Sequence, residues 1–237
     1  MMPGLPVIAR LDGRAFHTFT RGFDRPYDES MMHAMKETTR ALVKEFHASV
    51  GYTQSDEITL IWKEPSLFDG RYQKMTSVLA GYASSVFGRI ALSYSQNASY
   101  NWPSIIPCFD CRVFQVPNLS TAIDVLAWRE YDATKNSVAM AAQSIFSHKE
   151  LQNKNRGEQM DMLFSWGINW NDYPVHFKRG IYIRREVIMH ELDEHELANI
   201  PKEHQPSGPV PRRVVTVVDI PPIRMLEQDE VVELFFK

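Results

Sequence analysis

The stretch that most constrains the fold is YTQSDEITLIW, residues 52–62, because both ends of it have the composition of strands and its centre does not. Two β-rich runs, residues 50–54 and 58–62, flank a Ser-Asp-Glu sequence at 55–57. Acidic residues are disfavoured in strands and common in turns. We therefore predict a hairpin that carries its two acids at the bend.

The segments around this hairpin alternate between strand and helix signals. Residues 6–11 are an apolar run that ends at an Asp-Gly turn signal, which predicts a strand with Asp12 at its tip. Apolar residues recur at three- and four-residue steps over 26–46 and 72–94, as in amphipathic helices, and 108–114 reads as another strand. This order predicts an α+β fold on a ferredoxin-type βαββαβ antiparallel sheet. We expect both helices on one face and the other face free for a ligand.

The alternation of strand and helix signals ends after Pro117. A long helical run covers residues 120–146, and Ser120 is suited to cap it. Ser147 and Glu150 then have the spacing of a capping box, which predicts a shorter helix. The chain beyond residue 117 is therefore expected to be largely helical at first.

Two more β-rich runs, residues 180–189 and 212–220, are separated by a polar loop. Neither internal repeats nor low-complexity tracts mark a linker. We expect a catalytic core over residues 1–117 and a helical and β-hairpin region over 118–237 that completes the site, packed together as one unit.

Composition limits the class of protein. Hydrophobic residues make up 44% of the chain, enough for a buried core, and two cysteines cannot form a disulfide framework. The few cysteines lead us to expect a protein of the reducing cytoplasm. Apolar runs fall short of the roughly 18–20 residues that cross a bilayer, so we expect no membrane contact. A net charge of −3 excludes a chain that coats nucleic acid nonspecifically but leaves room for a local basic surface.

Two carboxylates stand at strand ends that a βαββαβ sheet brings together. Asp12 ends the first strand and Asp56 lies at the bend of the hairpin, while Gly13 leaves a backbone carbonyl free beside them. Such oxygen donors suit Mg²⁺, and a site of this kind holds up to two ions for phosphoryl transfer. On spacing alone the alternative stays open that both motifs are ordinary turns.

The chain resembles the tRNA-histidine guanylyltransferase family, and within it the guanylyltransferase-like 3′-5′ (reverse) polymerases most. The resemblance rests on motifs that follow one another in the same order over nearly the whole sequence. They are RLDGRAFHTFT, RPYDESM, YTQSDEITLIW, FDCRVFQVPN, LAWREYDATKNSV, FSHKEL and INWNDYPVHFKRG.

The resemblance implies a polymerase-palm-like core and a reaction. Members of this family add nucleotides to the 5′ end of tRNA in the 3′-to-5′ direction. ATP or GTP first activates a 5′-monophosphate, and the 3′-hydroxyl of an incoming NTP then attacks the activated phosphate. The implied cofactor is Mg²⁺, with two ions, the implied partners are tRNA and nucleoside triphosphates, and the implied assembly is a homotetramer.

The resemblance also assigns roles to the acidic motifs. Asp12, the carbonyl of Gly13 and Asp56 match the metal ligands of the family. Glu57, next to Asp56, completes the catalytic acids, and Ser55 is expected to hold nucleotide phosphate.

Three arginines are expected to bind nucleotide. Arg10 and Arg14 flank Asp12, and residues 10 and 12 of a strand face the same way, so that Arg10 reaches phosphates held at Asp12. A salt bridge that only neutralises the acids is the alternative for Arg10. Arg25 stands where relatives carry a lysine that touches triphosphate, and it adds bidentate geometry.

Other substrate contacts are expected from aromatic and basic residues. Phe16 and His17 are candidates for a base pocket, although an aromatic residue after a strand is more often part of the core. For tRNA we expect Lys178 and Arg179, which lie in the HFKRG motif.

The sequence departs from the family in one helix. Relatives that add a single guanylate to tRNA-histidine carry HINNLYN where this chain has TKNSVAM, residues 134–140. Lys135 and Asn136 remain expected contacts to nucleotide. The departure favours template-dependent repair of truncated tRNA 5′ ends over restricted addition at the −1 position of tRNA-histidine.

Two functions of other classes were weighed. A palm-fold nucleotide cyclase needs no RNA surface and often carries a GG(D/E)EF-type hairpin, which this sequence lacks. The other is a tRNA-binding module without catalysis, and the intact acids argue against it.

Overall fold

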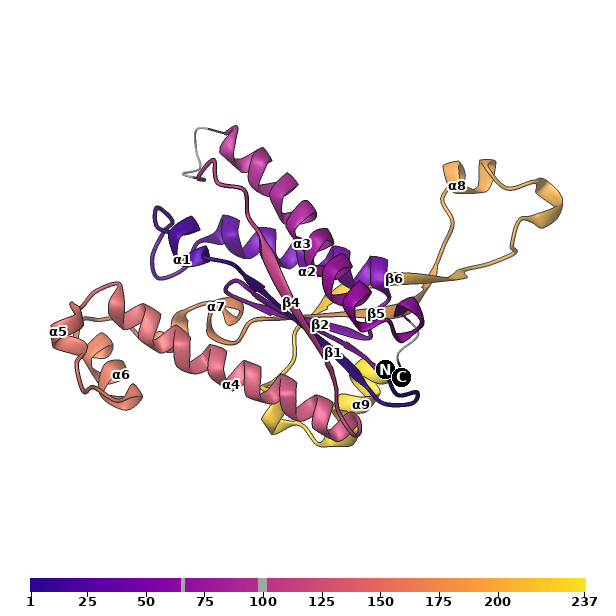
Figure 1. Cartoon of the computed structure of the whole chain (residues 1–237). Helices are drawn as coiled ribbons and strands as arrows, with labels where there is room; N and C mark the ends of the chain where they lie inside the picture. The colour runs from indigo at the N-terminus through magenta and orange to yellow at the C-terminus, as the bar shows by residue number, and fades with distance from the viewer. Residues whose placement is uncertain (65–66, 98–101) are drawn as a thin grey trace.

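The chain forms one six-stranded sheet in a computed structural model that describes residues 1–64, 67–97 and 102–237 (Figure 1). Neighbouring strands are all antiparallel, in the order β4-β1-β3-β2-β5-β6. The strands are β1 (Val7–Gly13), β2 (Val50–Gln54), β3 (Glu57–Trp62), β4 (Phe109–Gln115), β5 (Ile181–His190) and β6 (Val210–Val218). The predicted antiparallel sheet is confirmed, and β5 and β6 extend it beyond the four expected strands.

Helices lie between and after these strands. They are α1 (Phe16–Phe19), α2 (Glu29–Phe46), α3 (Tyr72–Ser95), α4 (Leu119–Gln143), α5 (His148–Leu151), α6 (Arg156–Ser165), α7 (Val175–Arg179), α8 (Glu194–Ala198) and α9 (Gln228–Phe236). Short 3₁₀ turns cover Leu67–Gly70, Trp170–Asp172, Lys202–His204 and Ile223–Met225. Apart from the short α1, the order up to β4 is the predicted strand, helix, strand, strand, helix, strand.

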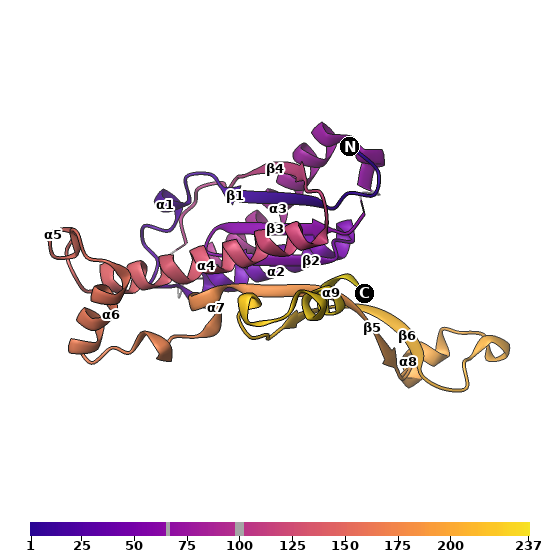
Figure 2. The ribbon, with the colours of Figure 1, turned by 90° about the horizontal axis from the view of Figure 1, so that it is seen from below.

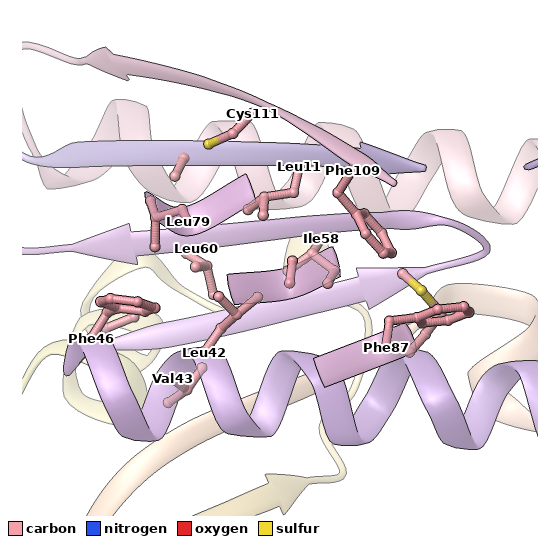
Figure 3. Close-up of a cluster of buried hydrophobic side chains, with 14 of the residues drawn as sticks. Leu11, Leu42, Val43, Phe46, Ile58, Leu60, Leu79, Phe87, Phe109 and Cys111 are labelled. Atoms are coloured by element: carbon pink, nitrogen blue, oxygen red, sulfur yellow. The ribbon is translucent and has the colours of Figure 1, made fainter. Parts of the chain in front are cut away.

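One face of the sheet packs against α2 and α3. Alternate residues of β1, Val7, Ala9 and Leu11, are fully buried on this side, as the two-residue period of a strand requires. Figure 3 shows how side chains of the two helices, such as Leu42 and Leu79, meet those of the sheet. Full burial of one such side chain contributes about 1.5–3 kcal/mol, so this cluster supplies a large part of the stability.

The other face is covered as well, contrary to the expectation that it stays free. Ile8 of β1, with Val50, Tyr52 and Ile61, forms a second buried cluster together with apolar residues of α4 and α9. Figure 2 shows both helices against the sheet. The expectation was wrong because the second half of the chain supplies apolar helix faces that need the same surface.

Two helices begin at residues other than those predicted. The carboxylate of Asp28 accepts hydrogen bonds from the first turn of α2, so this helix begins at Glu29. For α4 the cap is Asn118, whose side chain accepts from the backbone N–H of Thr121 at 2.9 Å, and not Ser120. In both cases the side chain that satisfies free N–H groups marks the start of the helix.

The second half contains elements that periodicity did not resolve. The predicted capping box of Ser147 and Glu150 is present at α5. Helices α6 and α9 were not predicted, and α8 lies within the segment expected to be a polar loop. Strands β5 and β6 run on past the rest of the sheet as an arm with α8 near its tip (Figure 1). Within the described residues, no helix is both long and apolar enough to cross a membrane.

Candidate active site

The end of β1 and the bend between β2 and β3 meet at one rim of the sheet. Asp12 is opposite Glu57 in the register of β1 and β3, and the N–H of Gly13 donates to the carbonyl of Asp56 at 3.0 Å. Glu57 therefore belongs to β3, and the bend holds only Ser55, at φ 53°, and Asp56. The prediction that Glu57 lies in the bend was wrong, but the acids do come to the same rim as Asp12.

The surroundings of Asp56 disfavour the charged form of its carboxyl group. Burial raises the pKa of its carboxyl, and the nearby charges of Asp12 and Glu57 raise it further, against hydrogen bonds from its own backbone and from Ser55. Across the described part of the chain, no lysine or arginine forms an ion pair with Asp56. Asp12 is 38% exposed and lies 3.8 Å from the guanidinium of Arg10. A cation bound between the two carboxylates would remove this unfavourable charge.

The donor set fits a magnesium ion. Mg²⁺ binds through one or two carboxylates with main-chain, water and phosphate oxygens. Asp12 and Asp56 supply the carboxylates and Gly13 a carbonyl oxygen, whereas the described residues contain no group of three or more His, Cys, Asp or Glu side chains that could hold a metal. The site would therefore depend on substrate and water for its remaining ligands.

Besides offering its carbonyl oxygen, position 13 must be glycine for a steric reason. A Cβ atom at this position would lie 2.5 Å from the ring of Phe16, well inside van der Waals contact. The ring is 2% exposed and packs against Phe87 and Phe109, with centroids 5.3 and 5.1 Å away. Only glycine lets the chain turn here without displacing that aromatic cluster.

Glu57 is bonded to two arginines instead of standing free. Its Oε2 accepts from Arg10 Nη2 at 2.6 Å and from Arg129 Nη2 at 2.7 Å, and Arg129 also lies 3.2 Å from Asp132. The side chains of Glu57 and Arg129 are 13% and 9% exposed. The salt bridge that remained an alternative for Arg10 is thus present, and its contact to phosphate stays a prediction.

A cavity of about 270 Å³ opens next to Asp56. Four of the predicted nucleotide contacts line it, namely Phe16, His17, Arg25 and Ser55. The volume is close to the lower end of the range of about 300–1,000 Å³ that is typical of small-molecule sites. Phe16 has both of the roles considered for it, since its ring belongs to the core and also borders the cavity.

The remaining nucleotide candidates lie outside this cavity. Arg14 is exposed, and its backbone N–H donates to the carbonyl of Cys108 at 2.8 Å. Lys135 and Asn136 are exposed on α4, where the amide of Asn136 lies 3.4 Å from Asp132. The contact partners of these three residues lie near the rim, but the three residues themselves do not border the cavity.

The two candidates for tRNA contact have partners within the protein. Arg179 Nη1 donates to Glu130 Oε1 at 3.1 Å and to the carbonyl of Ile220, with the side chain 19% exposed. Lys178 donates to the carbonyl of Asn171. Arg179 therefore ties α4 to the C-terminal segment, and contact of Lys178 and Arg179 with tRNA stays a prediction.

Sequence reasoning missed residues that α2, α4 and α7 bring to the site. His176 borders the cavity, and burial lowers its pKa while the charge of Glu29 acts in the opposite direction. Asp28 and Met140 also line it. Arg129 was visible only as part of the WREYD motif, because its contact with Glu57 joins residues 72 positions apart.

Known proteins resemble this chain in sequence. A family model for tRNAHis guanylyltransferase matches residues 1–117. An uncharacterized protein, R259, of Acanthamoeba polyphaga mimivirus is 34% identical over 204 residues, 76% of this chain and 70% of that protein. A probable tRNA(His) guanylyltransferase of Drosophila melanogaster is 30% identical over 211 residues, 81% and 71% of the two chains.

Solved structures resemble it over most of its length. A bacterial tRNA(His) guanylyltransferase-like protein in complex with GTP has a TM-score of 0.74 at 29% identity, covering 99% of this chain and 91% of the other. One in complex with ATP has a TM-score of 0.71 at 34% identity, covering 78% and 80%.

The sheet, the paired carboxylates and these likenesses define a nucleotidyltransferase. The chain belongs to the tRNA-histidine guanylyltransferase family.

Proposed function

We propose that this protein adds nucleotides to the 5′ ends of tRNA in the 3′-to-5′ direction, in a Mg²⁺-dependent reaction on a palm-like, ferredoxin-type sheet. The observation that carries the proposal is the pair Asp12 and Asp56, two carboxylates without a strong cation partner at one rim of the sheet, where Asp56 also lines the cavity. Arg25 and Ser55 line the same cavity, where a triphosphate would bring the ion's remaining oxygen ligands.

The reaction has two balanced steps. The 5′-monophosphate of the RNA attacks the α-phosphorus of ATP or GTP, which forms a 5′–5′ diphosphate linkage and releases pyrophosphate. The 3′-hydroxyl of an incoming NTP then attacks the RNA phosphate of that linkage, which forms a phosphodiester and releases the mononucleotide. Asp12, Asp56 and the Gly13 carbonyl would hold Mg²⁺, with two ions in the full site; the bound metal would supply a lower pKa for the attacking hydroxyl and neutralisation of phosphate charge.

Side chains of the protein itself contribute by holding the phosphate and the catalytic acids in place. Arg25 at the cavity supplies a planar, permanently charged fork that matches the geometry of phosphate oxygens. The hydroxyl of Ser55 bonds the carboxylate of Asp56 and thereby holds it at the bend. Glu57, bonded to Arg10 and Arg129, fixes β3 and α4 relative to the rim.

The proposed organisation follows from where these groups reside. Residues 1–117 carry both carboxylates, and residues 118–237 add Arg129 to the rim and Met140 and His176 to the cavity. We therefore treat the two parts as one integrated unit. ATP and GTP as nucleotides are supported by the related bacterial proteins solved with each of them. A homotetramer in the cytoplasm is proposed from the family resemblance.

Two versions of the reaction are compatible with this site. The names of the relatives favour guanylate addition at the −1 position of tRNA-histidine. The sequence TKNSVAM on α4 favours template-dependent repair, because Thr134 stands where the guanylate-adding relatives carry the first histidine of HINNLYN. We propose repair as the main activity.

The experiment that decides between them uses the purified protein with Mg²⁺, all four NTPs, and tRNAs either intact or lacking the first 5′ nucleotide. Preferential extension of the truncated tRNAs, with the nucleotide that pairs with the opposite strand, supports repair. Addition confined to tRNA-histidine replaces repair with the alternative. If no tRNA gains a nucleotide, the proposed function is wrong. If Asp56→Asn adds nucleotides as fast as the matched exposed variant Asp69→Asn, the assignment of Asp56 as a metal ligand is wrong.

A further inference from the structure

One face of α4 presents aromatic and basic side chains to solvent. Trp128, Tyr131 and Lys135 follow the i, i+3, i+7 spacing that places residues on the same side of a helix. Trp128 is 61% exposed and Tyr131 41% exposed. Large aromatic side chains that are neighbours on one helix face are seldom this exposed to solvent. Such a patch often marks an interaction site.

Two arginines from other elements reach the same face. The guanidinium of Arg224, in the turn before α9, lies 4.4 Å from the ring centroid of Tyr131, and that of Arg156, at the start of α6, lies 6.0 Å from it. We call Trp128, Tyr131, Lys135, Arg156 and Arg224 the α4 aromatic face.

The cations of the α4 aromatic face have no carboxylate partner among the described residues. Lys135, Arg156 and Arg224 form no ion pair there, whereas Lys154, two residues before Arg156, is paired with Glu158. On α4 itself Asp124 is exposed one turn before Trp128, and Asp132 is taken up by Arg129. Among the described residues, two cations without an ion pair thus lie over the ring of Tyr131, and a third, Lys135, stands one turn further along α4, on a chain whose net charge is −3.

This face is linked to the carboxylate rim by direct contacts. The ring of Trp128 lies 5.0 Å from the guanidinium of Arg129, which donates to Glu57. Glu57 in turn stands opposite Asp12 in the sheet. None of the five residues borders the cavity beside Asp56, so the α4 aromatic face is a separate surface that leads to the same rim.

We propose that the α4 aromatic face binds unpaired nucleotides of the RNA substrate and directs its end towards Asp12 and Asp56. Bases stack on Trp128 and on the guanidinium planes, while Lys135, Arg156 and Arg224 contact phosphates. This inference rests on the proposed function for the identity of the substrate. An acidic protein segment would match the cations but would leave the exposed indole without a partner, which is why we favour single-stranded RNA.

The test measures RNA binding by fluorescence anisotropy with the full chain. The probes are two fluorescein-labelled RNA hairpins of the same stem, one with a four-nucleotide single-stranded 3′ overhang and one blunt. We expect Trp128→Leu to weaken binding of the overhang hairpin by roughly 5- to 150-fold, the range for loss of one stacked base. Binding of the blunt hairpin should change less than about threefold.

Charge is tested separately from stacking. Arg224→Gln should weaken binding of both hairpins and lower the slope of log Kd against log salt by about 1, as expected for loss of one phosphate contact.

Matched controls lie on α3, which packs on the other face of the sheet. Tyr72→Leu, another exposed aromatic residue, is matched to Trp128→Leu, and Arg89→Gln to Arg224→Gln. Neither control should change the affinity.

Three results of the binding experiments overturn the inference. They are unchanged overhang binding in Trp128→Leu, equal weakening of both hairpins by that variant, and competition by a polyglutamate peptide as effective as that by RNA of equal charge. The melting temperature of each variant shows whether the fold is intact. A wild-type protein that discriminates the overhang but transfers no nucleotide overturns the proposed function alone. Transfer by Trp128→Leu with an unchanged KM for RNA overturns this inference alone.

Discussion

Asp56 and Glu57 are neighbours in the sequence and have opposite surroundings in the fold. Glu57 accepts hydrogen bonds from Arg10 of β1 and Arg129 of α4. Asp56 is half-buried, its pKa is raised by desolvation and by the charge of Asp12, and no arginine or lysine in the described residues pairs with it. An acid already neutralised by the protein holds elements together, whereas an acid left without a cation is available to a ligand.

The two acids have different surroundings because β3 begins between them. Glu57 is the first residue of β3 and faces α4, where Arg129 lies, while Asp56 remains in the bend beside Gly13. Because buried charges are stable only when compensated, the two acids have different requirements in the absence of ligand. The predictions below test whether the division into a structural and a ligand-binding acid is correct.

The largest effect is expected on catalysis. Asp12→Asn and Asp56→Asn should each lower the rate of 5′ nucleotide addition by more than about 100-fold, because even partners behind the metal ligands cost about 10–100-fold. Glu57→Gln keeps the shape and some hydrogen bonds, so its loss of rate should be smaller. Incorporation of labelled NTP at saturating Mg²⁺ measures this. If Glu57→Gln is as inactive as Asp56→Asn at an unchanged melting temperature, Glu57 acts in catalysis directly, as the family resemblance implies.

The second effect is on stability. Arg129→Met leaves Glu57 with one of its two arginines in a site where both side chains are nearly buried, so we expect a loss of about 3 kcal/mol in the free energy of unfolding, at the lower end for a broken buried pair. Urea unfolding measures it. The double variant Glu57→Gln/Arg129→Met should recover part of the loss, because the uncompensated charge is gone. Additive effects of the two substitutions would contradict a direct pair.

The third effect concerns Gly13, the last residue of β1, whose N–H donates to the carbonyl of Asp56. Gly13→Ala should cost about 1–3 kcal/mol, since the new methyl group overlaps the buried ring of Phe16. The matched control is Gly81→Ala on α3, where a Cβ meets no atom within 4 Å. This control should gain up to about 1 kcal/mol from helix propensity. Equal stability of the two variants, compared by thermal unfolding, would show that the rim tolerates movement of Phe16.

The smallest effect is a gain in stability. Asp56→Asn removes the buried charge, so in EDTA its melting temperature should exceed that of the wild type by a few degrees. Added Mg²⁺ should raise the melting temperature of the wild type and leave that of the variant unchanged. Asp69→Asn, at a side chain that is 90% exposed, serves as the control and should show neither change. A lower melting temperature for Asp56→Asn in EDTA would mean that its carboxylate is already compensated.

Local sequence signals determined much of the fold. The apolar run of residues 6–11, ending at an Asp-Gly turn signal, placed Asp12 at a strand end, and the hairpin signal placed Asp56 beside it. Both follow from backbone preferences that act over a few neighbouring residues. The family resemblance added a role for these acids, and four of the expected nucleotide contacts do border the cavity.

The sequence alone could not assign partners to the charged residues. Glu57 and Arg129 lie 72 positions apart, and Arg179 lies 49 positions from Glu130. Which acid meets which arginine depends on how α4 and α7 pack, and the same packing covers the sheet face that we expected to be free. Periodicity and turn chemistry thus determined where Asp12 and Asp56 stand, because those signals are local. Only the tertiary structure decided that Glu57 is neutralised and Asp56 is not, because charge compensation depends on contacts between distant segments.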